Sequence, residues 1–99
     1  MIYVIATLHV RAEKLPQLLD AARTVIAATR AEDGCVTYDL HQSITEPSEV
    51  VFVERWTSRE ALAKHFETPH MATWRAAGAD GILARKVEII TPEHVEARE

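Results

Sequence analysis

The sequence predicts an α+β fold of the ferredoxin-like type, in which a split βαβ pattern forms an antiparallel four-stranded sheet with both helical regions on one face. Four segments rich in β-branched and aromatic residues alternate in period two, and two helical regions separate them. Their order is strand, helix, strand, strand, helix, strand. With 99 residues the chain corresponds to a single domain, residues 1–99.

Charge and composition exclude several classes of partner. The formal net charge is −4, and acidic and basic residues are interleaved, so we expect neither a nucleic acid nor a membrane surface as a partner. No run of 18 apolar residues is present that could span a membrane. The chain has one cysteine, Cys35, and begins without a basic leader, so we expect a reducing, cytoplasmic location.

The first strand, over residues 2–10, has one continuously apolar face. This face should pack on the core and consists of Ile2, Val4, Ala6, Leu8 and Val10. The opposite face is mixed, so it should meet a cavity or another subunit; it consists of Tyr3, Ile5, Thr7 and His9.

The first helix is expected over residues 12–32, because apolar residues recur there at steps of three and four. Pro16 falls in its first turn, where a missing N–H is tolerated best. Gly34 follows the helix and could supply a left-handed residue.

Two strands, residues 35–43 and 50–57, should form an antiparallel hairpin around the turn residues Glu46, Pro47 and Ser48. In the second strand, Glu54 lies between Phe52 and Trp56 on a face that should be largely dry. A carboxylate there needs a partner, for which Lys64 or Arg75 are candidates, or its pKa rises.

The second helical region divides into two segments. Either Thr57, paired with Glu60, or Ser58 caps the first segment, which places His65 on or beside its apolar face. Thr68 and Pro69 begin a further short helix. The last strand is expected over residues 83–90, before Pro92.

A four-stranded sheet with its helices on one side leaves its other face bare. Half-apolar side chains should lie there, namely Tyr3, Ile5, Phe52 and Trp56. Two such sheets packed face to face would cover them. The sequence therefore predicts a homodimer formed through the sheet faces.

A run of motif residues resembles the antibiotic biosynthesis monooxygenase (ABM) domain family, most closely its small, stand-alone quinol monooxygenase branch. The run is Glu54-Arg55-Trp56-Thr57-Ser58, then Ala61-Leu62, then His65-Phe66-Glu67-Thr68-Pro69-His70-Met71. Weaker matches are the opening strand, residues 32–35 and residues 38–40. The resemblance implies a ferredoxin-like fold, a homodimeric α/β barrel and a pocket between sheet and helices. It also implies oxygenation of a small aromatic substrate with O2 and without metal or flavin.

The matching motif positions give the candidate site residues. His65 or His70 could remove a phenolic proton, and Glu54 could orient one of them or act itself. Trp56, Phe66 and Trp74 could wall an aromatic ring, and Tyr38 could donate to an oxygen anion. Each residue also has a purely structural interpretation, as a packed side chain or part of an ion pair. The asparagine that polyketide-oxidising members use has no match here.

No cofactor or metal is expected. His65 and His70 are five residues apart, which is not the spacing of one helix face, and no cysteine or carboxylate is expected to complete a ligand set with them. The three glycines form no phosphate-binding motif. In related haem-degrading enzymes the ligand histidine corresponds to a position near Arg75.

Three functions are compatible with these residues. The first is a cofactor-independent monooxygenase or oxidase of a small quinol or phenol. The second is an isomerase of a small, phosphorylated keto compound that uses the same Glu and His groups as proton shuttles, as a branch with the same motif does. The third is a non-catalytic dimer that binds a hydrophobic ligand. Dependence on O2 separates the first two.

Overall fold

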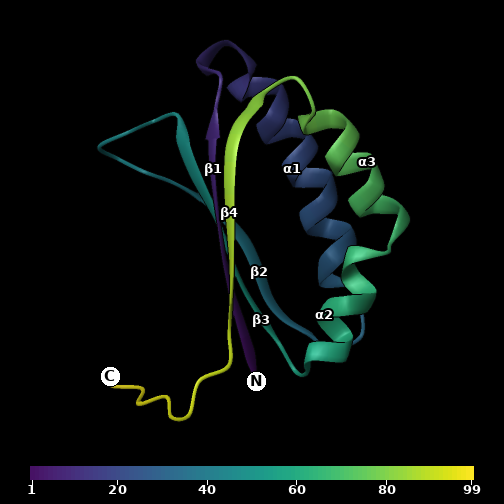
Figure 1. Cartoon of the computed structure of the whole chain (residues 1–99), viewed down its shortest axis with the longest axis vertical. Coiled ribbons are helices and arrows are strands. Elements are labelled where there is room, and N and C mark those ends of the chain that lie inside the picture. The colour runs from purple at the N-terminus through teal and green to yellow at the C-terminus, as the bar shows by residue number, and fades with distance from the viewer.

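The computed structural model describes all residues, 1–99, and has the predicted order of elements. They are β1 (Ile2–Val10), a 3₁₀ turn η1 (Ala12–Lys14), α1 (Leu15–Arg30), β2 (Cys35–Gln42), β3 (Glu49–Trp56), α2 (Arg59–Phe66), α3 (Pro69–Gly78) and β4 (Ile82–Ile90). The strands lie in the order β2-β3-β1-β4, and all neighbours are antiparallel. The three α-helices cover one face of the sheet (Figure 1). The predicted ferredoxin-like α+β fold is confirmed.

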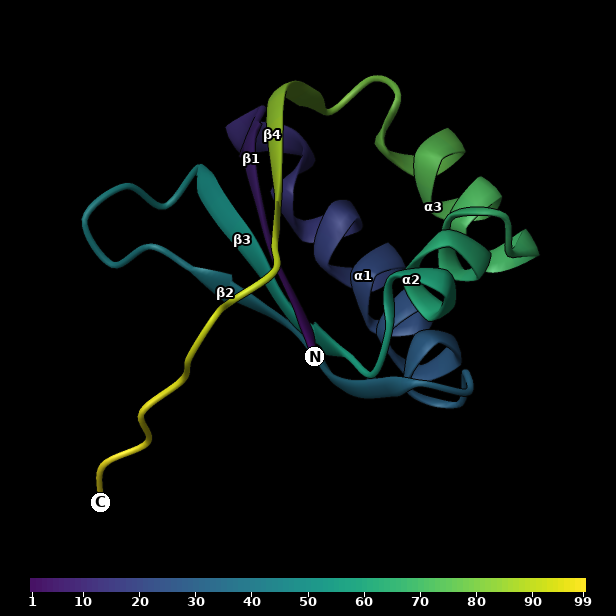
Figure 2. The same cartoon turned by 60° about the horizontal axis from the view of Figure 1, so that its bottom comes forward.

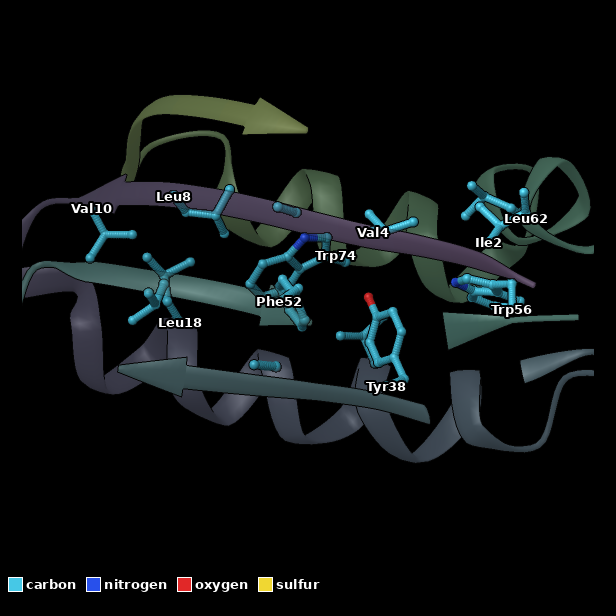
Figure 3. Packing of buried hydrophobic residues seen from close by; sticks show 14 residues of the cluster. Ile2, Val4, Leu8, Val10, Leu18, Tyr38, Phe52, Trp56, Leu62 and Trp74 are labelled. Carbon is cyan, nitrogen blue, oxygen red and sulfur yellow. The ribbon is translucent and has the colours of Figure 1, made fainter. Parts of the chain in front are cut away.

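The core lies between the sheet and the helices. The apolar face of β1 is buried along its whole length, as predicted, and packs with side chains of α1, α2, α3, β2 and β3. Figure 3 shows these side chains in a row along β1, from Val10 and Leu18 at one end to Leu62 and Trp56 at the other. Trp56 and Leu62 are completely buried.

The first helix is shorter than predicted at both ends. It begins at Leu15 because Pro16 has no N–H with which to close an α-helical turn back to residue 12, so residues 12–14 form a separate 3₁₀ turn. It ends at Arg30, after which the N–H of Glu32 bonds to the carbonyl of Thr29 and tightens the last turn. Gly34 has the predicted left-handed conformation, with φ of 86°.

The prediction that Phe52 and Trp56 help to form the bare sheet face is wrong. Phe52 pairs with Ala6 and Trp56 pairs with Ile2, and cross-strand partners point to the same face. Both aromatic residues therefore point toward the helices. Alternation within one strand cannot assign the face, because the register between β1 and β3 is set by contacts distant in sequence.

The remaining strand boundaries differ from prediction by one residue each. β2 ends at Gln42, β3 runs from Glu49 to Trp56, and β4 begins at Ile82. After β4 the chain leaves the sheet and runs away from the body of the molecule (Figure 2). None of the helices has the length and apolar character that crossing a membrane requires.

Candidate functional site

An apolar cavity of about 140 Å³ lies between the sheet and helices α2 and α3. Its wall includes three buried titratable side chains, Glu54, His65 and Tyr38, and two arginines, Arg75 and Arg85. Its other lining residues are Val4, Ala6, Leu8, Phe52, Phe66, Met71, Trp74 and Val87. A largely apolar pocket with a few polar groups is the usual form of a small-molecule site.

His65 is the most buried polar group of this cavity. It lies in the last turn of α2, is 1% exposed, and packs its ring against Trp56 and Tyr38 at centroid distances of 4.7 and 5.3 Å. Burial lowers the pKa of its imidazole, against the opposing effect of Glu32. The neutral ring donates its Nδ1–H to Oε2 of Glu32 at 2.8 Å. Nε2 makes no hydrogen bond within the chain, so its lone pair is available as an acceptor, and the residue lines the cavity.

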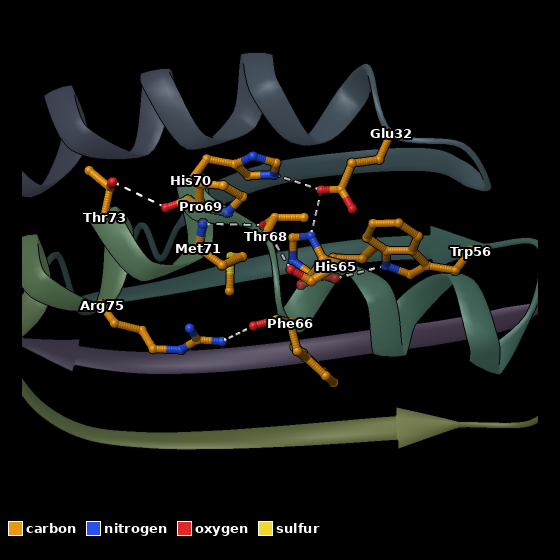
Figure 4. Close-up of polar contacts among 11 residues, drawn as sticks. Glu32, Trp56, His65, Phe66, Thr68, Pro69, His70, Met71, Thr73 and Arg75 are labelled. Carbon is orange, nitrogen blue, oxygen red and sulfur yellow. Dashed lines mark hydrogen bonds and ion pairs between the residues drawn. The ribbon is translucent and has the colours of Figure 1, made fainter.

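Glu32 connects His65 to His70. The same oxygen, Oε2, accepts from His65 Nδ1 and from His70 Nε2, the latter at 2.7 Å (Figure 4). This carboxylate fixes the tautomer of His65 and holds its ring in place. Sequence reasoning did not assign Glu32 to the site. The available signal was the weak family match over residues 32–35, which includes both Glu32 and the Gly34 turn.

The break between α2 and α3 lets both histidines reach Glu32. Thr68 caps α3 by accepting the N–H of Met71 at 3.3 Å, and its hydroxyl donates to the carbonyl of His65 at 2.8 Å. His65 thus ends one helix and His70 begins the next. The five-residue spacing of His65 and His70 would place them on different faces of one continuous helix, but here they belong to two separate helices. The expectation that no carboxylate accompanies the histidines is therefore wrong, because Glu32 does.

Glu54 also lies in the cavity wall and is 5% exposed. Its partner is neither Lys64 nor Arg75. Instead, Trp56 donates its Nε1–H to Oε1 of Glu54 at 2.9 Å. Burial raises the pKa of Glu54 to about 7, and the Trp56 hydrogen bond only partly opposes this shift. The group can therefore hold or release a proton near neutral pH.

The structure brings five of the seven predicted site residues to the cavity. These five are Glu54, His65, Tyr38, Phe66 and Trp74. Trp56 is 0% exposed and lies outside the lining, so it contacts the site through Glu54. His70 lies outside it too and contacts the site through Glu32. Burial raises the pKa of Tyr38, which keeps its phenol protonated and able to donate.

The fold and the pocket define a small ferredoxin-like protein with a buried histidine at an apolar cavity. A family model described as antibiotic biosynthesis monooxygenase matches residues 1–77. The chain belongs to this ABM family.

Several relatives carry monooxygenase names. "Putative monooxygenase Rv0793" from Mycobacterium tuberculosis is 44% identical over 75 residues, 76% of this chain and 69% of that protein. "Putative monooxygenase YcnE" from Bacillus subtilis is 30% identical over 94% of this chain and 97% of its own. "Probable quinol monooxygenase YgiN" from Escherichia coli is 26% identical over 76% of this chain and 80% of its own. Protein sll1783 from Synechocystis is 32% identical over 89% of this chain. The matched region spans only 59% of the length of that relative.

Solved structures share the fold. The structure of Rv0793 superimposes with a TM-score of 0.89 at 33% identity, covering 97% of this chain and 98% of that one. The structure described as "Putative antibiotic biosynthesis monooxygenase from Nitrosomonas europaea" has the same TM-score at 29% identity. The superposition covers 95% of this chain and 100% of that one.

Proposed function

We propose that this protein is a cofactor-independent monooxygenase or oxidase of a small quinol or phenol, with O2 as the oxidant. The observation that carries the proposal is His65, a neutral buried imidazole fixed by Glu32 through Nδ1, with Nε2 left for a ligand in an apolar cavity. The family's monooxygenase names support it, and the name of YgiN supports a quinol.

The size of the cavity favours a substrate with one aromatic ring. A cavity of about 150 Å³ holds one benzene molecule, and this cavity is of nearly that volume, about 140 Å³. Phe66 and Trp74 lie in its wall and would contact the faces or edges of the ring. Larger substituents would have to extend out of the cavity.

Proton removal is the first step of the proposed reaction. Nε2 of His65 accepts the proton of a substrate hydroxyl, while Glu32 stabilises the imidazolium through the Nδ1–H bond. The resulting quinolate is electron-rich. Arg75 and Arg85 line the same cavity and supply positive charge, and Tyr38 supplies a neutral donor, for the oxygen anion.

Oxygen then accepts an electron from the quinolate, which gives a semiquinone and superoxide. If a second electron and two protons follow, the products are the quinone and H2O2. If the radicals recombine at a ring carbon, the hydroperoxide loses water, so that quinol and O2 give hydroxyquinone and H2O. Both outcomes balance without any other oxidant. The low polarity of the cavity would protect the radicals from water.

The alternative is an isomerase that moves a proton between two carbons of a keto compound. Glu54 favours it, because a carboxyl group with a pKa of about 7 can both take up and return a proton. Arg75 and Arg85 would then bind an anionic group of the substrate, such as a phosphate.

We also propose that two chains form a homodimer through the bare sheet face. Ile5, Val53 and Ile90 are 37%, 40% and 38% exposed there, and they lie around a hollow also lined by Tyr3, Pro92 and Val95. Contiguous apolar surface of this kind marks interaction sites. A second copy of the same face would cover it.

Oxygen uptake distinguishes these functions. Metal-free protein is incubated with one-ring hydroquinones and with naphthalene- and anthracene-sized phenols under ¹⁸O2, and catalase is added to reveal H2O2. We expect uptake above the autoxidation rate, fastest with one-ring substrates, and either one labelled oxygen per product or H2O2. No uptake with any of these substrates would contradict the oxygenase, and turnover of a phosphorylated keto compound at the same rate with and without O2 would support the isomerase.

A further inference from the structure

We propose that Glu32, His65 and His70 form a binding site for a divalent transition-metal cation such as Zn²⁺. One ligand atom of each residue lies within 4.8 Å of the others: a carboxylate oxygen and two imidazole nitrogens. Two histidines and one carboxylate form a ligand set that suits Zn²⁺ and leaves a fourth position for water. This site goes beyond the proposed oxygenation, which needs no metal.

The hydrogen-bonded arrangement is close to the geometry of such a site. Oε2 of Glu32 is 2.8 Å from His65 Nδ1 and 2.7 Å from His70 Nε2. A tetrahedral ion with bonds of about 2.1 Å holds its ligands roughly 3.4 Å apart. The two pairs that include Glu32 must therefore open by less than about 1 Å, while the two histidine nitrogens already lie within 4.8 Å of each other. The cation would replace the two ring protons that now lie between these atoms.

The positions of the three residues permit this adjustment. Glu32 lies in the bend between α1 and β2, and His70 lies in the first turn of α3. Their side chains are 14% and 22% exposed, so an ion and its water can reach them, whereas His65 at 1% is the fixed member. Trp56 and Tyr38 pack on the His65 ring and hold it in place.

Metal binding would change the role of His65 at the cavity. In the metal-free protein the proton sits on Nδ1, and Nε2 carries the lone pair that accepts the substrate proton. A cation bound at Nδ1 uses the lone pair of Nδ1, so the Nδ1 proton is displaced and the neutral ring carries its proton on Nε2. His65 then becomes a donor and can no longer act as the base. The cation is therefore expected to inhibit oxygen uptake, and this consequence rests on the proposed function.

A second group of potential ligands provides a matched control. His9 on β1, Glu46 in the β2–β3 connection and Glu49 at the start of β3 also place their ligand atoms within 4.8 Å of one another. His9 Nε2 and Glu49 Oε1 are 3.5 Å apart, and the side chain of His9 is 44% exposed. His9→Ala removes a histidine from this surface group and leaves the Glu32 site unaltered.

The test measures Zn²⁺ binding by isothermal titration calorimetry and by metal analysis after dialysis. We expect one ion per chain for the wild type and for His9→Ala, with a dissociation constant on the order of micromolar. Loss of one ligand in His70→Ala or Glu32→Gln should weaken binding at least about tenfold. Circular dichroism verifies that each variant is folded. Absence of binding at 100-fold excess, or equal binding by wild type and His70→Ala, would overturn the site.

The activity measurement is separate from the binding measurement. Zn²⁺ should inhibit the oxygen uptake of the wild type at the concentration at which the site fills, and EDTA should restore it. Binding without any oxygen uptake in the metal-free protein would leave the site standing and contradict the proposed function. Inhibition that is lost in His9→Ala would place the ion on the surface and contradict the site.

Discussion

Glu54 shows how a single buried carboxyl group links the site to stability. Its pKa rises from an ordinary value of 4.5 to about 7 because it is buried with one neutral donor, Trp56. The native state therefore keeps its proton where the unfolded state has released it. The free energy of unfolding therefore falls as the pH rises from about 4.5 through 7. Because one pKa unit corresponds to about 1.4 kcal/mol, this group alone accounts for a loss of about 3 kcal/mol.

Glu54→Gln should remove this pH dependence, because the amide stays neutral. The wild type should lose up to about 3 kcal/mol in free energy of unfolding between pH 4 and pH 8.5 through this group, and the variant should not. The difference in free energy of unfolding, variant minus wild type, should therefore rise by up to about 3 kcal/mol over this range. Urea denaturation at both pH values measures it. Glu60→Gln changes an exposed carboxylate and serves as the control. A stability difference from the wild type that is the same at both pH values would contradict the shift.

Single residues of the site were predictable to different degrees. Glu54 and His65 could be found because their types are unusual on an apolar face and because the motif includes them. Glu32 could not be assigned, since an acidic residue just beyond a helix has many surface roles. Its approach to His65 and His70 depends on contacts 33 and 38 residues apart in sequence.

At the scale of elements, the turn between α1 and β2 positions Glu32 against α2. Gly34 has φ of 86°, and a Cβ atom there would lie 2.6 Å from the Cβ of Ala61 and 2.8 Å from Oγ1 of Thr57. Its carbonyl accepts the N–H of Thr57 at 2.8 Å. The turn is thus held in contact with the start of α2. The sequence predicted the left-handed residue but not this close approach.

Gly34→Ala should destabilise the protein by about 2–4 kcal/mol, because strain from positive φ and steric overlap with α2 add. Thermal or urea unfolding measures the change. In Gly34→Ala combined with Ala61→Gly the overlap with Ala61 is relieved, while the close contact with Thr57 and the backbone strain remain. The double variant should therefore recover part of the loss relative to Ala61→Gly alone. Unchanged stability in the single variant would show that the turn is not held against α2.

Local signals predicted the elements better than their relative positions. Caps, Pro16 and the period of apolar residues gave every helix and strand to within a few residues. The face of β3 was misassigned, because register depends on pairing between β1 and β3 rather than on either strand alone.

For the whole molecule, the apolar outer face of the sheet predicts a dimer. Light scattering at micromolar concentration should give about twice the chain mass of 11.1 kDa. Val53→Glu places a charge on that face and should shift the population toward monomer, because a buried unpaired charge is costly. Ile44→Glu is the control, since Ile44 is 99% exposed in the β2–β3 connection. A wild-type protein that remains monomeric would contradict the dimer.

The central claim, that His65 accepts a proton from a quinol that O2 then oxidises, is tested most directly by chemical rescue. Oxygen uptake is measured for the wild type, for His65→Ala with and without added imidazole, and for His41→Ala, which alters an exposed histidine of β2. We expect His65→Ala to lose at least about 100-fold in rate, imidazole to restore part of it, and His41→Ala to match the wild type. A His65→Ala variant that consumes oxygen at the wild-type rate would contradict the account.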